Sequence, residues 1–293
     1  DVAQFFGIAL AGGSTNNVTA TVENVTVSNI RNTGMAQSIV ISSGLFDGGA
    51  SVGSINANIS NISIHDITST NSLVTGFLLA GATQSSVVNT VNIRNATVTN
   101  LSAAGSSQFL TDLGSGAVFA IAGAAAESIQ NTMTATNILL ANNNVSDCAT
   151  ANLNSIYFVS GSVQTFINSG GGNISDDNTC STYLTQPSDQ HNVAGLFSTL
   201  GPLTDNGGSV PTMALLQNSP AVDGGVVVSV LTEDARGAAR PQGATYDSGA
   251  YESSFTKPST ATLARTGLSV LLVVAAALTL IGLPVISYMI TEH

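Results

Sequence analysis

The sequence predicts an all-β protein: a single-stranded parallel β-helix with an irregular C-terminal capping region, followed by one transmembrane helix. A short apolar motif that ends in glycine recurs along the chain, with its glycines at Gly12, Gly44, Gly81, Gly123 and Gly161. A second motif, in which apolar and polar residues alternate, lies between its copies. Helix-forming residues are scarce, and a long apolar segment closes the chain.

Each repeat contains at least two short strands. The glycine motif has the form FLLAG at 77–81, and the second motif has the form ISIHDI at 62–67. Alternation at every second position is typical of strands with one buried face. Self-similarity at intervals of about 20–50 residues indicates stacked repeats. Propeller blades have a similar length, but this chain lacks their aromatic signatures, so the turns of a β-helix fit better. We expect asparagines at strand ends to stack as amide ladders, and Ala11, Ala80, Ala122 and Ser160 to align in rows.

Composition restricts the functions that this chain can perform. It has 293 residues, with 6 Lys and Arg against 17 Asp and Glu, and a formal net charge of −11. A nucleic-acid-binding protein needs basic residues to replace counterions, so a nucleic-acid partner is not expected. Charged residues make up 8% of the chain and hydrophobic residues 43%, so the chain is too apolar to be disordered.

The two cysteines, Cys148 and Cys180, bound a segment that is rich in Gly and Asp near its end. In an exported chain a lone pair of cysteines predicts one disulfide, and two buried free thiols are the alternative. Asp176, Asp177 and Asn178 gather hard oxygen atoms and form a candidate Ca²⁺ site, although such a run is more often a solvated loop. No His or Cys spacing indicates zinc, and no other cofactor is expected.

Eight Asn-x-Ser/Thr sequons have two interpretations. They can be N-glycosylation sites of a eukaryotic secreted protein. They can also arise by chance in a strand repeat that is rich in Ser, Thr and Asn, and this is the interpretation that we favour. The sequons begin at Asn17, Asn24, Asn58, Asn61, Asn95, Asn100, Asn144 and Asn173.

The sequence changes character after residue 199, which divides the predicted repeats (1–199) from a closing block (200–252). Four prolines and turn-forming runs such as DNGG at 205–208 appear there. Arg236 and Arg240 lie among carboxylates, and we expect both to hold irregular backbone through carboxylates and carbonyls. Because a β-helix end exposes core and unpaired strand edges, we expect the closing block to seal the last turn.

The closing block resembles the C-terminal region of the choice-of-anchor Q family of bacterial surface proteins. The similar segments, in order, are LGPL at 200–203, DNGG at 205–208, ALL at 214–216, SPAVD at 219–223, DxRG at 234–237, RPQG at 240–243 and DxGAYE at 247–252. The upstream GNIS run at 172–175 and the loop to Cys180 are also similar to that family. The resemblance implies a right-handed β-helix of the pectin-lyase-like kind, exported and held by a C-terminal anchor. It implies no enzymatic activity, and no catalytic residue is carried over.

The tail predicts attachment to the cell envelope. Residues 253–266 have the composition of a linker, and residues 267–290 are apolar enough to span a bilayer, with a buried core helix as the alternative. The chain starts at Asp1 and not at Met, so we expect N-terminal sequence to be missing. The expected location is extracellular, at the cell surface, with the membrane or cell wall as the partner of the tail.

A short segment before the apolar tail is similar to a sortase sorting signal of the Leu-Pro-x-Thr-Gly type. It consists of Leu263, Ala264, Arg265, Thr266 and Gly267. Ala264 replaces the expected proline, and the chain ends without a basic cluster. Cleavage by a sortase and retention as a simple transmembrane anchor therefore both remain open.

The run GASVG at 49–53 matches the G-x-S-x-G pattern of a nucleophile elbow. That motif needs a strand-turn-helix context and a downstream acid and histidine. Strand-like sequence follows it here, so a glycine-rich turn is the better interpretation.

Carbohydrate chemistry on a pectin-lyase-like fold needs paired carboxylates, or Ca²⁺ with a basic group. The repeats contain only Arg31 and Arg94 as basic residues, and Asp47, Asp66 and Asp112 are scattered singly. We therefore expect no catalytic site, and a non-enzymatic surface protein with an adhesive or structural role and a glycan or other surface ligand. Two alternatives stay open. One is a polysaccharide lyase or hydrolase with carboxylates clustered near Arg31 or Arg94; the other is a self-associating coat or fibre component.

Overall fold

The computed structural model describes residues 5–257 apart from 13–15, 44–52, 84 and 107–112. The described chain is mostly β-strand, with one short helix, α1 (Asn154–Tyr157), and one 3-10 helix, η2 (Leu196–Thr199). Residues up to Thr256 form one compact unit, so the first residues of the predicted linker belong to it. The predicted sorting signal (Leu263–Gly267) and the predicted membrane segment (267–290) lie outside the described residues. Among the described residues, no helix is both long and apolar enough to cross a membrane.

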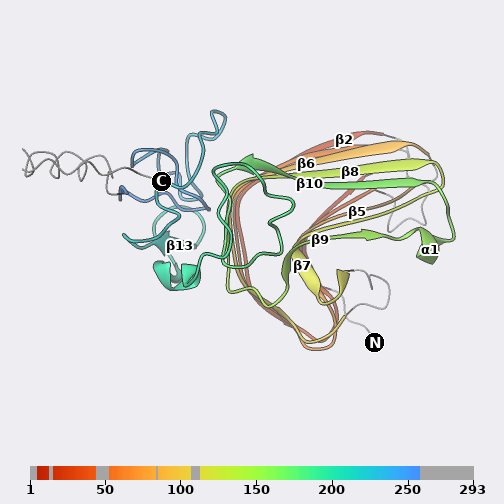
Figure 1. The fold of residues 1–293 in the computed structure, drawn as a ribbon, viewed down its shortest axis with the longest axis horizontal. Helices are drawn as coiled ribbons and strands as arrows, with labels where there is room; N and C mark the ends of the chain where they lie inside the picture. The colour runs from red at the N-terminus through yellow and green to blue at the C-terminus, as the bar shows by residue number, and fades with distance from the viewer. Residues whose placement is uncertain (1–4, 13–15, 44–52, 84, 107–112, 258–293) are drawn as a thin grey trace, which may run out of the picture. The chain divides into compact units, whose positions relative to one another are not determined.

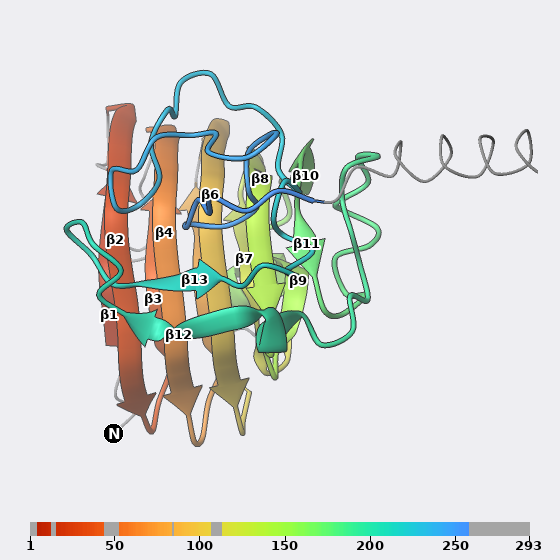
Figure 2. The same ribbon diagram turned by 90° about the vertical axis from the view of Figure 1, so that its left-hand side faces the viewer.

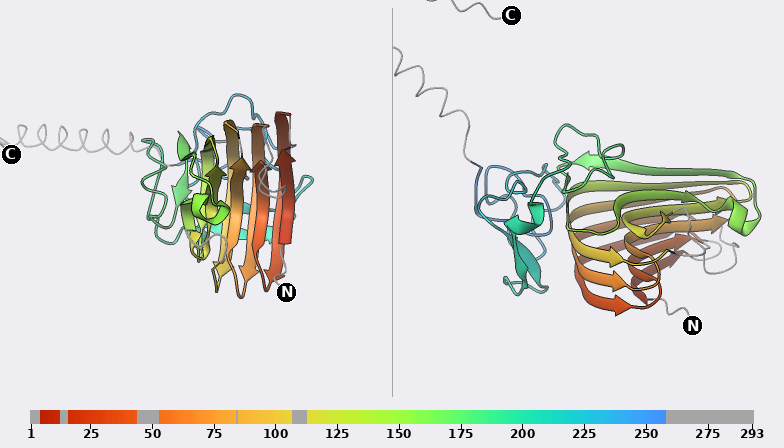
Figure 3. Two further views of the ribbon diagram at one scale, coloured as in Figure 1. Left: turned by 90° about the vertical axis from the view of Figure 1, so that its right-hand side faces the viewer. Right: turned by 60° about the horizontal axis from the view of Figure 1, so that its bottom comes forward.

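Two parallel sheets form the body, and consecutive strands alternate between them (Figures 1 and 3). Each step along the chain places one short strand in sheet 1 and one longer strand in sheet 2, directly beside their predecessors. The fold is therefore all-β with parallel sheets, as the sequence predicts. Sheet 1 contains β1 (Phe5–Gly12), β3 (Ala36–Ser43), β5 (Val74–Thr83), β7 (Gly116–Ala125) and β9 (Ser146–Asn152). Sheet 2 contains β2 (Val18–Asn32), β4 (Ile55–Ser69), β6 (Val87–Ala103), β8 (Ser128–Ala141) and β10 (Ser162–Gly171), and β11 (Ile174–Ser175) also pairs with β8.

The long strands β2, β4 and β6 bend twice, and the chain through β8 bends at the equivalent positions, the second of them just after β8 ends at Ala141. Each bend carries a residue with a positive φ, between 52° and 60°. Asparagine and aspartate tolerate this left-handed conformation better than other residues with a side chain. The first row of bends is Asn24, Asn61, Asn95 and Asn137, and the second row is Asn29, Asp66, Asn100 and Asn142. Strands β2, β4 and β6 are therefore each divided into a first, a middle and a third segment, and the residues that follow β8 continue it as its third segment.

The core lies between the two sheets and is built from aligned rows of apolar side chains. Ile39, Phe77, Phe119 and Cys148 occupy the same register position on four successive strands of sheet 1. The Phe77 and Phe119 rings stack with centroids 5.5 Å apart. Strand β7 is buried along its whole length. Ala120 and Ala122 of that strand belong to a second apolar cluster, which includes Leu153 beside α1.

The predicted repeat register is correct for its first copies and wrong for its last. Ala11, Ala80 and Ala122 lie in one row, together with Ser42. The next member of that row is Ala151 of β9 and not the expected Ser160. Helix α1 occupies 154–157, so the copy predicted at 157–161 is not the fifth strand of sheet 1.

The asparagines of the first row form an amide ladder, but at bends inside the strands and not at the strand ends where the sequence predicts it. The Asn61 Nδ2 donates to Asn24 Oδ1 (3.2 Å), Asn95 Nδ2 to Asn61 Oδ1 (3.4 Å), and Asn137 Nδ2 to Asn95 Oδ1 (3.1 Å). Asn61, Asn95 and Asn173 begin sequons and are buried. A glycan on any of these three would not fit the folded protein, which favours the chance interpretation for them.

Removing one rung tests the ladder. Asn95→Ala should lower the free energy of unfolding by about 2–3 kcal/mol, because it strains a positive φ and leaves buried amide partners unpaired. Asn95→Gly is the matched control, since it accepts the positive φ but also lacks the amide, and it should be less destabilising than alanine. Urea unfolding followed by circular dichroism measures both. Equal losses for the two variants would show that the bend conformation contributes nothing.

The segment 196–253, called the collar from here on, lies across the outer face of sheet 2 (Figure 2). It contains η2 and the antiparallel pair β12 (Leu200–Thr204) and β13 (Thr212–Leu215). Thr26 of β2 donates to the Pro211 carbonyl, and the Ala250 amide donates to Thr97 of β6. The collar also bonds to β4 and β8 at the first row of bends. The closing block therefore contacts more than the last turn that it was expected to seal: it bonds to Gly172 and packs on Ile174 of β11, and it also lies beside all four long strands.

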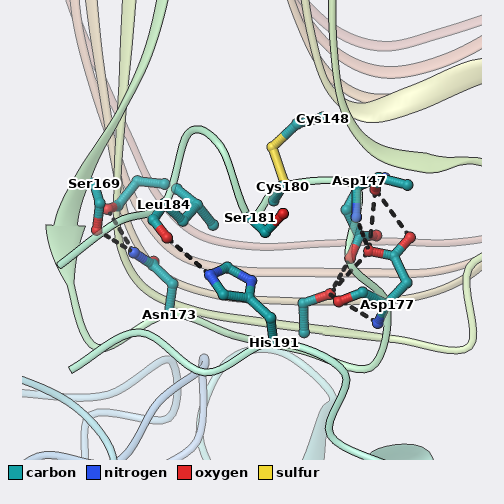
Figure 4. Close-up of a disulfide and its surroundings, with 12 residues drawn as sticks. Asp147, Cys148, Ser169, Asn173, Asp177, Cys180, Ser181, Leu184 and His191 are labelled. Atoms are coloured by element: carbon teal, nitrogen blue, oxygen red, sulfur yellow. Dashed lines mark hydrogen bonds between the residues drawn. A yellow bond between two sulfur atoms is a disulfide. The ribbon is translucent and has the colours of Figure 1, made fainter. Parts of the chain in front are cut away.

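The loop that follows β11 packs against the main core, and Figure 4 shows the disulfide that holds it. A disulfide joins Cys148 on β9 to Cys180 in this loop, as the sequence predicts. Cys180 and Leu184 are buried in the main core, and Tyr183 packs against it. His191 Nε2 and the Leu184 carbonyl oxygen are 2.8 Å apart, a hydrogen bond that holds the loop. The disulfide loop therefore adds buried side chains to the core beside β9.

Opening this disulfide should destabilise the protein. A separation of 32 residues corresponds to about 3–4 kcal/mol in the chain-entropy model. We expect the variant Cys148→Ser/Cys180→Ser to unfold at correspondingly lower urea, and reduced wild type to behave in the same way. Unchanged midpoints after reduction, with free thiols verified chemically, would contradict this expectation.

Candidate ligand groove

An open polar groove of about 670 Å³ runs along the third segments of the long strands, on the side that faces η2. Two rows of polar side chains line it. The bend residues Asn29, Asp66, Asn100 and Asn142 form one row. The residues two positions further along the chain form the other. The lining residues are Asn29, Arg31, Asp66, Thr68, Asn100, Ser102, Asn142, Asn144 and Phe197.

Strand register places these side chains. Arg31 pairs with Thr68, Thr68 pairs with Ser102, and an isolated parallel bridge joins Ser102 to Asn144. Residues two apart on a strand lie on the same face, so each strand contributes a bend residue and a polar partner to the groove. Successive strands are about 4.8 Å apart, so the groove presents similar polar groups at that interval.

Hydrogen bonds hold the bend residues of the groove in place, but the Arg31 side chain stays available to a ligand. Asn142 Nδ2 donates to Asn100 Oδ1 (2.7 Å), and Asn100 Nδ2 donates to Asp66 Oδ1 (2.8 Å). Asn142 is further held at its backbone, where its N–H donates to Asp176 Oδ2 at 2.6 Å. Within the described part of the chain, the Arg31 side chain has neither a hydrogen bond nor an ion pair. Its exposed guanidinium is thus available to a ligand.

Phe197 gives the groove one apolar surface. It lies on η2, which begins after Gly195 with a φ of 71°. The neighbouring Leu196 is buried in the collar core, which fixes the short helix and leaves Phe197 partly exposed. A site with convergent amides and hydroxyls and one aromatic surface suits a hydroxylated ligand such as a sugar.

The charged residues that line the groove bear on the alternative of a carbohydrate-active enzyme. Asp66 is the one carboxylate among its lining residues, whereas glycoside hydrolysis requires a pair. Arg94 does not line the groove and instead donates to Asn58 Oδ1 at 3.1 Å, on the outer face of sheet 2. The alternative of a polysaccharide lyase or hydrolase predicts carboxylates clustered near Arg31 or Arg94. The described residues that line the groove contain no such cluster.

The candidate Ca²⁺ residues use their oxygens for backbone contacts. Asp176 accepts from the Asn142 N–H, and Asp177 accepts from the Thr179 N–H (2.9 Å) and hydroxyl. Asn178 is exposed. Among the described residues, no group of three His, Cys, Asp or Glu side chains is arranged to hold a metal. The nucleophile-elbow candidate, Ser51, lies outside the described residues.

A buried carboxyl beside the disulfide is a feature that sequence reasoning missed. Asp147 is 1% exposed and accepts from the Ser175 hydroxyl (2.5 Å) and from Asn143 Nδ2 (3.2 Å). Burial, with a further contribution from the nearby Asp177 carboxylate, raises the pKa of Asp147 to about 8. This carboxyl is therefore protonated at neutral pH. Its hydrogen bond with Ser175 connects β9 to β11.

Arg236 and Arg240 hold the collar together, as the sequence predicts. Arg240 pairs with Glu252 at 2.7 Å, and both side chains are fully buried. Arg236 pairs with Asp234 at 2.6 Å and lies 3.6 Å from the centre of the Tyr251 ring. These contacts connect the DxRG, RPQG and DxGAYE segments of the closing block.

The groove residues were not selected from the sequence, although a signal for them exists. Each copy has the pattern Asn or Asp, one residue, then a polar residue, as in Asn29-Ile30-Arg31 and Asn100-Leu101-Ser102. The pattern recurs at the repeat interval. It also fits the apolar–polar alternation of a strand, so the sequence alone indicates a strand there and not a binding site.

The chain has no match among protein-family models, curated proteins or solved structures in the three comparisons. The groove must therefore be interpreted from its own geometry.

Proposed function

We propose that this protein is an exported, envelope-anchored surface protein that uses the polar groove to bind a glycan, in a non-enzymatic adhesive role. The observation that carries the proposal is the groove itself. Its repeated amides and hydroxyls, the exposed Arg31 guanidinium and the Phe197 ring match the chemistry of a sugar chain. The single carboxylate in its lining favours binding over hydrolysis.

The proposal for the fold is a right-handed, single-stranded parallel β-helix of the choice-of-anchor Q kind. Two parallel sheets joined by alternating strands support a helical path of the chain. The hand and the family are inferred from the closing-block segments quoted above. The collar contacts explain why those segments contain paired arginines and carboxylates.

Anchoring is proposed from the tail sequence. An apolar segment at 267–290 and a sorting-signal-like run at Leu263–Gly267 follow the compact unit directly. Such a tail holds an exported domain at the envelope, whether a sortase joins it to the wall or the segment stays in the membrane.

A binding and turnover screen tests the function. The full chain in detergent micelles is applied to immobilised envelope and host glycans, while reducing ends and unsaturated products are measured in the same samples. We expect retention on at least one glycan class without product release. Release of products would show a carbohydrate-active enzyme, and no retention on any glycan would contradict the adhesive role.

A further inference from the structure

One row of the groove consists of side chains that have no partner. These side chains lie two residues beyond the bends and are called the free row from here on. They are Arg31 of β2, Thr68 of β4, Ser102 of β6 and Asn144, which follows β8. Within the described part of the chain, none of the four makes a hydrogen bond or an ion pair through its side chain. A ligand in the groove therefore meets, in this order, a cation, two hydroxyls and an amide.

Arg31 differs from the other arginines of the body and the collar in being free. Arg94 is hydrogen-bonded, and Arg236 and Arg240 are held in ion pairs. Arg31 is exposed, in a chain with a formal net charge of −11. A guanidinium presents a planar fork of donors that matches the two oxygens of a carboxylate. The β2 end of the groove therefore suits an acidic group of a ligand.

The rest of the groove does not suit a ligand with an acid on every sugar. Asp66 lies on β4, which is the neighbour of β2. Its Oδ1 accepts from Asn100, and its Oδ2 accepts no hydrogen bond from the residues that the structure describes. An ionised carboxylate accepts hydrogen bonds and donates none, so it binds hydroxyls and repels acids. The negative net charge of the chain also acts against a polyanion.

The opposite end of the groove is apolar. Phe197 lies on η2, which starts at Leu196. Shortly before η2, the Val193 N–H donates to the Ser175 carbonyl of β11, and β11 pairs with β8. Phe197 therefore lies toward β8, while β4 and β6 separate β8 from β2 in the sheet. With strands about 4.8 Å apart, the two ends of the groove are about 14 Å from each other.

From this order of groups we propose that the groove binds an oligosaccharide that carries one carboxylate, at one end, and is otherwise neutral. The inference rests on the proposed glycan-binding function, and it adds the class of ligand and the direction in which the ligand lies. The carboxylate binds Arg31. Hydroxyls of the following sugars bind Asp66 and the rest of the free row, and the apolar face of the last sugar packs on Phe197.

The spacing of the groove fits this ligand. Successive strands are about 4.8 Å apart, which is close to the length that one sugar adds to an extended chain. Each strand therefore faces about one sugar, and the guanidinium and the aromatic ring contact sugars at opposite ends of the same oligosaccharide.

An array of paired oligosaccharides tests the inference on the full chain in detergent micelles. The array holds tetrasaccharides that end in a uronic or a sialic acid, and each is placed beside the same compound with its carboxylate reduced to an alcohol. Polygalacturonate serves as the polyanion. We expect the acid form of at least one pair to bind about tenfold more tightly than its reduced form, because hydrogen bonds between charged partners are the stronger kind. That acid form should also bind more tightly than polygalacturonate.

Three variants locate the two ends of the ligand. Arg31→Ala should bind the acid and reduced forms equally, whereas Arg94→Ala removes the same charge outside the groove and should keep the preference. Phe197→Ala should weaken both forms by the same factor, because the ring and the guanidinium are about 14 Å apart and act independently. Loss of the acid preference in Phe197→Ala would contradict the proposed direction of the ligand.

The outcomes separate this inference from the proposed function. Equal binding of the acid and reduced forms in every pair would overturn the inference and leave glycan binding in place. Tighter binding of polygalacturonate than of every tetrasaccharide would overturn the single carboxylate. Binding to no glycan of the array, acidic or neutral, would contradict the proposed function itself.

Discussion

Replacing Arg240 with methionine is expected to lower the free energy of unfolding by about 3–5 kcal/mol, because it leaves a buried carboxylate without its partner. Arg240 donates to Glu252 Oε2 (2.7 Å) and to the carbonyls of Asp247 (3.0 Å) and Gly249 (2.8 Å). One guanidinium therefore joins two distant parts of an irregular segment. Urea unfolding at pH 7 measures the loss.

Two controls separate the buried charge from lost packing. Arg236→Met removes the same group from a site that is 13% exposed, so it should be less destabilising. Arg240→Met/Glu252→Met removes both buried charges and should recover part of the stability lost by Arg240→Met alone. If the double variant is as unstable as the single one, the loss comes from packing and backbone contacts and not from an unpaired carboxylate.

The pH dependence of stability should be dominated by Asp147 at neutral and mildly alkaline pH. Its pKa is about 8 in the folded protein and 3.8 in the unfolded chain, so the folded state binds the extra proton between these values. The stability that Asp147 contributes is fully present below pH 3.8 and is lost as the pH rises through 8. The whole window corresponds to about 6 kcal/mol.

His65 acts in the opposite direction over part of that window. Burial, opposed by the nearby Asp66 charge, lowers the pKa of His65 from 6.5 to about 4, so acidification through this range destabilises the folded state. Between pH 4 and 6.5 the two groups offset each other, and above pH 6.5 His65 no longer opposes the Asp147 effect. Burial also raises the pKa of Asp176, Asp247 and Glu252, which adds to the Asp147 effect.

We therefore expect the free energy of unfolding to fall by about 2 kcal/mol between pH 6.5 and pH 8. Asp147→Asn keeps the size of the side chain and cannot ionise, so it should remove most of that slope. Urea titrations at four pH values in this range test both proteins. An identical slope in the variant would show that another group carries the effect.

Much of the body was predictable because its signals are local. The alternation in β2, β4 and β6 identifies strands, and the repeat interval identifies stacking. Amide ladders were predictable in kind but not in place, because they form at bends inside the strands and not at strand ends. The failure at 157–161 has a local cause as well: YFVSG resembles the glycine motif, but α1 competes for residues 154–157 and the strand forms earlier, at Ser146–Asn152.

The position of the collar was not predictable from the closing block alone. Its motifs identify contacts within the block, such as Arg240 with Glu252, but not the surface on which it lies. That surface is encoded in the middle segments of the long strands, where Thr26, Ser63 and Thr97 face outward in one row. Small polar residues on an outward row are indistinguishable in sequence from ordinary solvated positions until their partners are known.

The groove was missed for a related reason. Its polar residues come from β2, β4, β6 and the segment that follows β8, and each contributes only two side chains. Their convergence depends on bends at Asn29, Asp66, Asn100 and Asn142, and positive φ angles are not visible in a strand alternation. Phe197 joins them only because the collar folds back along sheet 2.

The most direct test of the central claim is the affinity of groove variants for the glycan that the full chain retains best. Arg31→Ala and Ser102→Tyr should each weaken binding at least tenfold, the first by removing a donor and the second by filling the groove. Arg94→Ala removes the same charge outside the groove and should bind like wild type. Unchanged affinity in both groove variants, with circular dichroism showing intact folding, would contradict a ligand site in this groove.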